Sequence, residues 1–241
     1  MKQMAFTVLG GLLLTSVALA QMPGGKPPPD PCAALAKFFK KDAEFTATAN
    51  VVVTGKKSRD NQTMTMRLAV SGRKMRSEMD MSKMGNVSGG DLDGMKQMGM
   101  DQMVILALPE KEQSATYMVF PNLKSYCDMP NPNKGSTDGT LEKTELGSDT
   151  VEKHACKKSK LTFTGKDGKT AEAIIWEAVD LKDFPIQYQT VENGQTTTTT
   201  FSDIKMDKPD ASLFELPAGY KKFGGMQEMI MGNMQRMMQG Q

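Results

Sequence analysis

The residues best suited to chemistry in this chain are methionines, of which it has 22 in 241 residues. Two groups share the spacing M-x-x-M-x-M-x-x-M: Met95, Met98, Met100 and Met103 in one, and Met226, Met229, Met231 and Met234 in the other. Soft thioether ligands suit Cu(I), so a copper-binding protein is one candidate. The alternative is that flexible methionines form adaptable apolar surfaces, which pack on a sheet or contact a hydrophobic ligand.

Enzymatic chemistry has little support in the residues. The single histidine, His154, lies among lysines on a predicted strand, where a solvated side chain is the expectation. The chain has no G-x-S-x-G or H-E-x-x-H motif, no evident carboxylate pair and no phosphate-binding glycine loop. Trp176 lies beside Ile174 and Ile175 on an apolar strand, which favours core packing. We therefore expect no enzyme, no catalytic residues, no cofactor and no assigned metal ligands.

Residues 1–20 have the features of a secretory signal peptide. Lys2 precedes an apolar run that ends in Ala18-Leu19-Ala20, an A-x-A cleavage site before Gln21. The run is short for a membrane span of about 20 residues, and no cysteine stands at the first mature position. We expect a mature protein that is periplasmic or secreted, with no stable membrane anchor. A formal net charge of +2 gives no electrostatic case for nucleic acid.

An exported chain can form disulfides, and this one has three cysteines. Cys127 and Cys156 lie in or beside predicted strands, whereas Cys32 lies near the N-terminus. A Cys127–Cys156 bridge is therefore predicted, with a structural role, because no C-x-x-C arrangement indicates a redox pair.

The elements that would position these residues are mostly strands. Residues 21–30 are expected to form a linker rich in proline and glycine. A short amphipathic helix is expected over residues 32–41, with Asp30 as its N-cap and Pro31 at the first helical position. From Phe45 the apolar period falls to two, which predicts antiparallel strands with one apolar face. About ten strands follow in largely sequential order, with a long loop over residues 82–101. Residues 223–241 read as a methionine-rich helix or tail.

Several stretches resemble a known superfamily. They are EFTATANVVV from Glu44, GRKMRSEMD from Gly72, Trp176-Glu177-Ala178 with the following Asp183-Phe184-Pro185-Ile186, and Phe214-Glu215-Leu216-Pro217-Ala218-Gly219-Tyr220. In this order they resemble the lipoprotein-carrier (LolA/LolB-like) superfamily and, more closely, an exported bacterial domain family of unknown function related to it. The resemblance covers roughly residues 40–222 within a predicted domain of residues 31–222.

The resemblance implies a mainly β (α+β) fold, a curved antiparallel half-barrel sheet with an N-terminal helix. Such a sheet needs a partner for its apolar face or leaves that face open to a ligand. We therefore expect a non-enzymatic binding protein for a hydrophobic group or a lipoprotein acyl chain. The residues expected to line the face are Phe45, Ala47, Val51, Met64, Met66, Leu68, Val70, Met75 and Met79. A copper-binding protein that uses the methionine clusters and an envelope protein-interaction module remain the alternatives.

Overall fold

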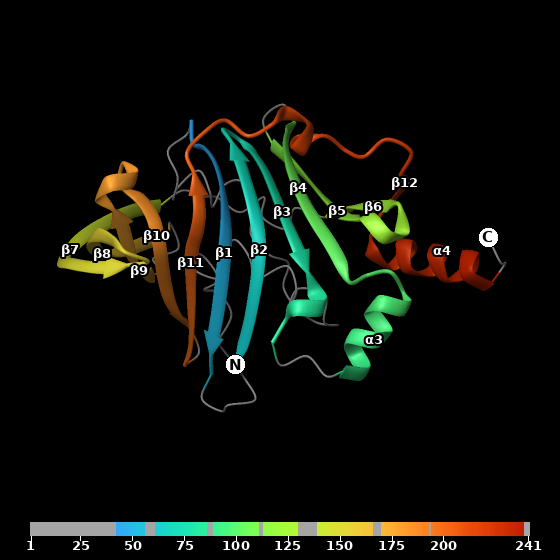
Figure 1. Cartoon of the computed structure of the whole chain (residues 1–241), viewed down its shortest axis with the longest axis horizontal. Coiled ribbons are helices and arrows are strands. Elements are labelled where there is room, and N and C mark those ends of the chain that lie inside the picture. Colours follow the sequence, from blue (N-terminus) through green and yellow to red (C-terminus); the bar gives the residue numbers. More distant parts are fainter. Residues whose placement is uncertain are drawn as a thin grey trace.

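The chain forms one large, open, curved sheet of twelve strands in the computed structural model (Figure 1). The structure describes residues 42–55, 61–85, 89–110, 113–129, 139–165, 170–192 and 194–238. The predicted signal peptide (1–20), linker (21–30) and helix (32–41) lie outside the described residues. A mainly β fold with a curved antiparallel sheet is therefore confirmed.

The strands run in two sequential series. The first is β1 (Glu44–Thr54), β2 (Gln62–Ser71), β3 (Lys74–Asp80), β4 (Gln102–Glu110), β5 (Gln113–Phe120) and β6 (Ser125–Met129). The second is β7 (Gly139–Val151), β8 (His154–Gly165), β9 (Thr170–Ala178), β10 (Phe184–Glu192) and β11 (Gln195–Lys205). The two series join where β1 pairs with β11, and every pair in both series is antiparallel. Short polar turns and alternating apolar residues favour this arrangement.

The segment after β11 crosses the sheet before the chain ends. Between β11 and β12 (Lys221–Phe223) it buries Phe214 against Ala69 of β2, Leu106 of β4 and Tyr117 of β5. β12 then pairs with β6, and this pair is parallel. We call the face of the sheet that this segment covers the outer face. The sequence did not indicate β12, because three residues are too few to show a period.

Two helices lie near the β6 and β12 end of the sheet (Figure 1). α4 (Met226–Met238) confirms the helical alternative for the C-terminal segment, and it contacts β6 and β12. α3 (Gly89–Gln97) corrects the long loop predicted over residues 82–101. Its glycines suggested irregular backbone, but the helix forms and ends at Gln97. Gly99 follows it with a φ of 66°, the left-handed conformation that is common just beyond a helix C-terminus.

Candidate functional site

The face opposite the outer face carries the largest apolar cluster of the described residues, and we call it the inner face. Its buried side chains come from α4 and from every strand except β7, whose Val151 packs against them and is partly buried. Strand register arranges them in rows that run across neighbouring strands. One row contains Phe45, Val70, Met75 and Ala107, in order from β1 to β4. Because apolar and polar residues alternate along each strand, the apolar side chains of neighbouring strands form one continuous surface.

All nine residues predicted from the sequence lie together in this inner-face cluster. Each is between 0% and 6% exposed. They are Phe45, Ala47, Val51, Met64, Met66, Leu68, Val70, Met75 and Met79. Their shared location follows from the period of two, which fixes the face of each strand. Their role in ligand binding stays a prediction.

Thioether side chains concentrate on the central strands of the inner face. Met66 of β2 pairs with Met79 of β3, and Met79 pairs with Met103 of β4. All three are at most 6% exposed, so three methionines lie side by side in the core. Methionine has more rotatable bonds than leucine and fills irregular spaces, so this part of the core can change shape at low cost.

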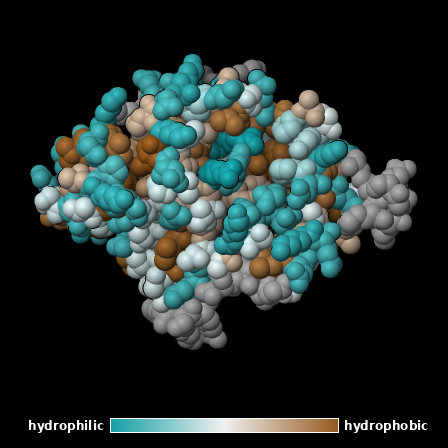
Figure 2. Space-filling view, viewed as in Figure 1, coloured by the Kyte–Doolittle hydropathy of each residue, from teal (hydrophilic) through white to brown (hydrophobic). Residues whose placement is uncertain are grey.

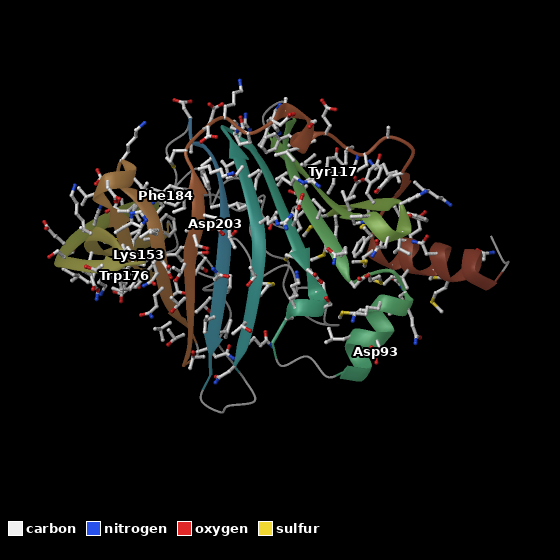
Figure 3. All side chains as sticks on the ribbon, viewed as in Figure 1. Asp93, Tyr117, Lys153, Trp176, Phe184 and Asp203 are labelled. Carbon is white, nitrogen blue, oxygen red and sulfur yellow. The ribbon has the colours of Figure 1, made fainter. Side chains whose placement is uncertain are left out.

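Aromatic rings from β1, β10 and β11 pack together on the inner face. The centroid of the Phe184 ring lies 5.0 Å from that of Phe45 and 5.7 Å from that of Phe201, both with edge-to-face geometry. Figure 3 shows Phe184 near the β10 end of the molecule, with Tyr117 on the opposite side of the sheet's centre. On the other side, Phe223 of β12 and Met229 of α4 complete the cluster. The sequence had not connected these residues with the predicted nine.

Two ionisable groups on the inner face, Cys127 and Tyr188, are held neutral. Burial raises the pKa of the Cys127 thiol to about 11, with a smaller contribution from the neighbouring Asp128 carboxylate. Burial also raises the pKa of Tyr188 to about 12. Both groups therefore stay protonated at neutral pH, and neither can serve as a charged base there.

The predicted Cys127–Cys156 disulfide is wrong, since both residues are buried free thiols in the structure. Cys127 lies on β6 and Cys156 on β8, and the order of strands in the sheet places β5, β1 and β10, among others, between them. A disulfide requires Cα atoms within about 7 Å, which is ordinarily met by neighbouring strands. The Cys156 thiol donates instead to the His154 carbonyl oxygen at 3.3 Å.

The two methionine groups do not form matching sites. In the first group, Met103 is buried at 6% exposure, whereas Met98 is 38% exposed at the end of α3. In the second, Met229 is fully buried and Met231 is 65% exposed, because residues two apart on a helix point about 200° apart. The equal spacing therefore falls on different local structures, and neither group gathers its four sulfur atoms on one side.

Polar residues at the β7 to β9 end form surface contacts. The His154 ring Nδ1 lies 2.7 Å from an Asp180 carboxylate oxygen. Trp176 is 6% exposed, as expected for core packing, and its ring Nε1 donates to Asp149 at 3.0 Å. Asp149 accepts this bond and others, which lowers the pKa of its carboxyl group. Within the described part of the chain, no three His, Cys, Asp or Glu side chains are placed to hold a metal ion.

The surface itself is mixed in character. Figure 2 shows hydrophilic and hydrophobic residues interspersed on the side toward the viewer, with hydrophobic residues gathered at the β7 to β10 end. Among the described residues, no helix is both long enough and apolar enough to cross a membrane.

The chain was compared with known families, sequences and structures. No protein-family model matches it, and no curated protein matches it in sequence. Among solved structures it is similar to the lipoprotein LppX of Mycobacterium tuberculosis, with 11% identity and a TM-score of 0.41 over 73% of this chain and 98% of that one. It is also similar to a LolA superfamily protein from Nitrosomonas europaea, with 10% identity and a TM-score of 0.36 over 74% of this chain and 92% of that one.

A third similar structure is a DUF1329 family protein from Desulfovibrio piger, with 11% identity and a TM-score of 0.36 over 76% of this chain and 94% of that one. The Nitrosomonas europaea protein belongs to the superfamily that the sequence resembles, and the Desulfovibrio piger protein belongs to a domain family of unknown function.

Proposed function

We propose that this chain is a non-enzymatic exported binding protein that holds a hydrophobic or acyl group against the inner face of its sheet. The observation that carries the proposal is the row of Met66, Met79 and Met103 at the centre of that face. A core meant only for stability is better specified by branched residues with well-defined rotamers. Flexible thioethers suit a surface that must repack around an incoming chain.

The chemistry of the inner face supports binding over catalysis. Its residues are apolar, and its buried Cys127 and Tyr188 have raised pKa values that keep them uncharged. The lone histidine, His154, lies at the start of β8, where its ring contacts Asp180, and it is not part of the inner-face cluster. Charged groups beside the cluster include Lys158, with Nζ 4.9 Å from the centroid of the Trp176 ring, and Lys221, with Nζ 4.8 Å from the centroid of the Phe223 ring.

Entry of a ligand requires side chains to move, because the nine predicted residues are at most 6% exposed. α4 covers the inner face at the β6 and β12 end through Met226 and Met229. The predicted signal peptide places the mature protein in the periplasm or outside the cell, where acyl groups of lipids and lipoproteins are available.

The proposal is tested by native mass spectrometry of protein purified from its own envelope and by titration with a fluorescent fatty acid. Replacement of Met64, Met79 and Met103 by leucine keeps the core apolar but stiffens it, and we expect weaker binding of probes with bulky or bent chains. The matched control replaces Met98, Met231 and Met234, which are 38%, 65% and 48% exposed, and should bind as the wild type does. Protein that carries no lipid and takes up no probe would refute the proposal.

A further inference from the structure

Asn233 is a polar residue in the apolar stripe of α4. Met226, Met229 and Asn233 follow one another at intervals of three and four residues, so they share one side of the helix. Met229 is fully buried and Asn233 is 7% exposed, whereas Met231 is 65% exposed. The side of α4 that faces the sheet therefore carries a primary amide where a methionine or leucine would ordinarily lie.

The amide nitrogen of this residue has no acceptor. Nδ2 of Asn233 is buried without a hydrogen-bond partner in the part of the chain that the structure describes. A buried donor that stays unpaired costs free energy, and folded proteins rarely leave one without a reason. An acceptor supplied by a bound molecule would remove this cost.

The position of Asn233 is set by close packing of α4 on β12. At the preceding residue, Gly232, an added Cβ would lie 2.7 Å from Cε1 of Phe223. The backbone of α4 therefore lies directly against the Phe223 ring, which belongs to the inner-face cluster and pairs with Cys127 of β6. Asn233 is thus placed where the apolar inner face meets the end of the sheet.

A positive charge lies beside the same ring. Nζ of Lys221 is 4.8 Å from the centroid of the Phe223 ring, and residues two apart on a strand share a face. No carboxylate lies within ion-pair distance of Lys221 among the described residues; Glu228, the acidic residue in the first turn of α4, accepts from the backbone N–H of Gly224. The neighbouring Lys222, in contrast, is paired with Asp128 at 3.0 Å.

We propose that Asn233 and Lys221 receive the carboxylate of an amphiphilic ligand whose hydrocarbon chain lies on the inner face. The Asn233 amide donates to one carboxylate oxygen, and the Lys221 ammonium balances its charge beside the Phe223 ring. This inference rests on the proposed function and specifies its ligand as a long-chain carboxylate, because an ester or an alcohol lacks the charge that Lys221 would pair.

The test compares the fluorescent fatty acid cis-parinaric acid with its methyl ester. Asn233→Leu should weaken binding of the acid by roughly tenfold, since a hydrogen bond to a charged group is lost. It should leave binding of the ester unchanged, and the thermal midpoint should stay equal or rise because a buried unpaired donor is removed. Lys221→Met should weaken binding of the acid and reduce the salt dependence of that binding. Lys222→Met is the matched control and should bind both probes as the wild type does.

The outcomes separate this inference from the proposed function. If the acid and the ester bind equally and no variant changes either, the head-group site is refuted while the hydrophobic binding protein stands. If Asn233→Leu lowers the thermal midpoint and weakens both probes alike, Asn233 is a structural residue and the inference is refuted. If neither probe binds the wild-type protein, the proposed function itself fails.

Discussion

The hydroxyl of Ser77 donates a hydrogen bond to the sulfur of Met66, with an Oγ to Sδ distance of 3.2 Å, in the middle of the apolar inner face. Both residues are 1% exposed. Ser77 pairs in register with Leu68, so Met66 is its diagonal neighbour on β2. A thioether is a weak acceptor, yet here it satisfies a hydroxyl that water cannot reach.

Met66→Leu should therefore destabilise the protein by about 1–3 kcal/mol, because it leaves the Ser77 hydroxyl buried without this acceptor. Met79→Leu, at an equally buried position in the same row, is the control and should cost less than about 1.5 kcal/mol. The double variant Met66→Leu with Ser77→Ala should recover part of the loss. Urea denaturation measures the free energy of unfolding of each variant. An equal loss of stability for Met66→Leu and Met79→Leu would contradict the prediction.

Two helical glycines should respond in opposite ways to alanine. Gly94 of α3 has open space around it, so Gly94→Ala should stabilise the protein by up to about 1 kcal/mol through helix propensity. At Gly232 of α4 the new Cβ would meet the Phe223 ring, so Gly232→Ala should destabilise by roughly 1–3 kcal/mol as overpacking does. Thermal and urea unfolding of both variants provide the check, and a stabilising Gly232→Ala would show that α4 does not lie on Phe223.

Stability should fall in alkaline solution. The folded protein keeps the Cys127 thiol proton up to about pH 11, whereas the unfolded chain loses it from 9.0 upward. The Tyr188 hydroxyl likewise keeps its proton up to about pH 12 in the folded protein, whereas the unfolded chain loses it from pH 10.0 upward. Because the unfolded state then binds fewer protons, the free energy of unfolding is highest below pH 9.0 and decreases above it.

Urea midpoints at about pH 8, 9.5 and 11 measure this decrease. Cys127→Ala should flatten the first part of the curve and Tyr188→Phe the later part, even where each variant is less stable overall. A wild-type midpoint that stays constant across this range would contradict burial of both groups.

The two described cysteines should react only after unfolding. Burial raises the pKa of both Cys127 and Cys156, and little thiolate is present at neutral pH. We expect a thiol-directed label to modify neither in the folded protein and both in denatured, unreduced protein. Peptide mapping by mass spectrometry identifies the labelled positions. Recovery of a linked peptide pair that contains Cys127 and Cys156 would contradict the free thiols.

Local alternation made much of the fold predictable. In β1, residues such as Phe45 and Ala47 alternate with Thr46 and Thr48, and this period of two fixes both the strand and its buried face. The same reasoning placed all nine predicted residues on one face. A period says nothing about which strands become neighbours, however, so the sequence placed Cys127 and Cys156 together although the sheet separates them.

The features that the sequence missed depend on contacts between distant segments or on unusual backbone. β12 forms through its pairing with β6, in which Phe223 lies opposite Cys127, almost a hundred residues earlier in the chain. The turn between β7 and β8 uses Glu152 and Lys153 with φ of 48° and 76°, where glycine or asparagine would be the usual signal. Asn233 could have been noticed as a polar residue four positions after Met229, but its burial follows only from the way α4 packs.

The pairing of β1 with β11 sets the order in which this chain can fold. Within each series the strands pair with their neighbours in sequence and can form through short loop closures, whereas Ala49 and Phe201 must meet across most of the protein. Closing so long a loop carries the larger entropic cost, so the barrier to folding is expected to lie at this junction. The methionine-rich centre of β2 to β4 can therefore form before β11 pairs with β1. Until that pairing forms, the folding chain is expected to leave these methionines exposed to solvent.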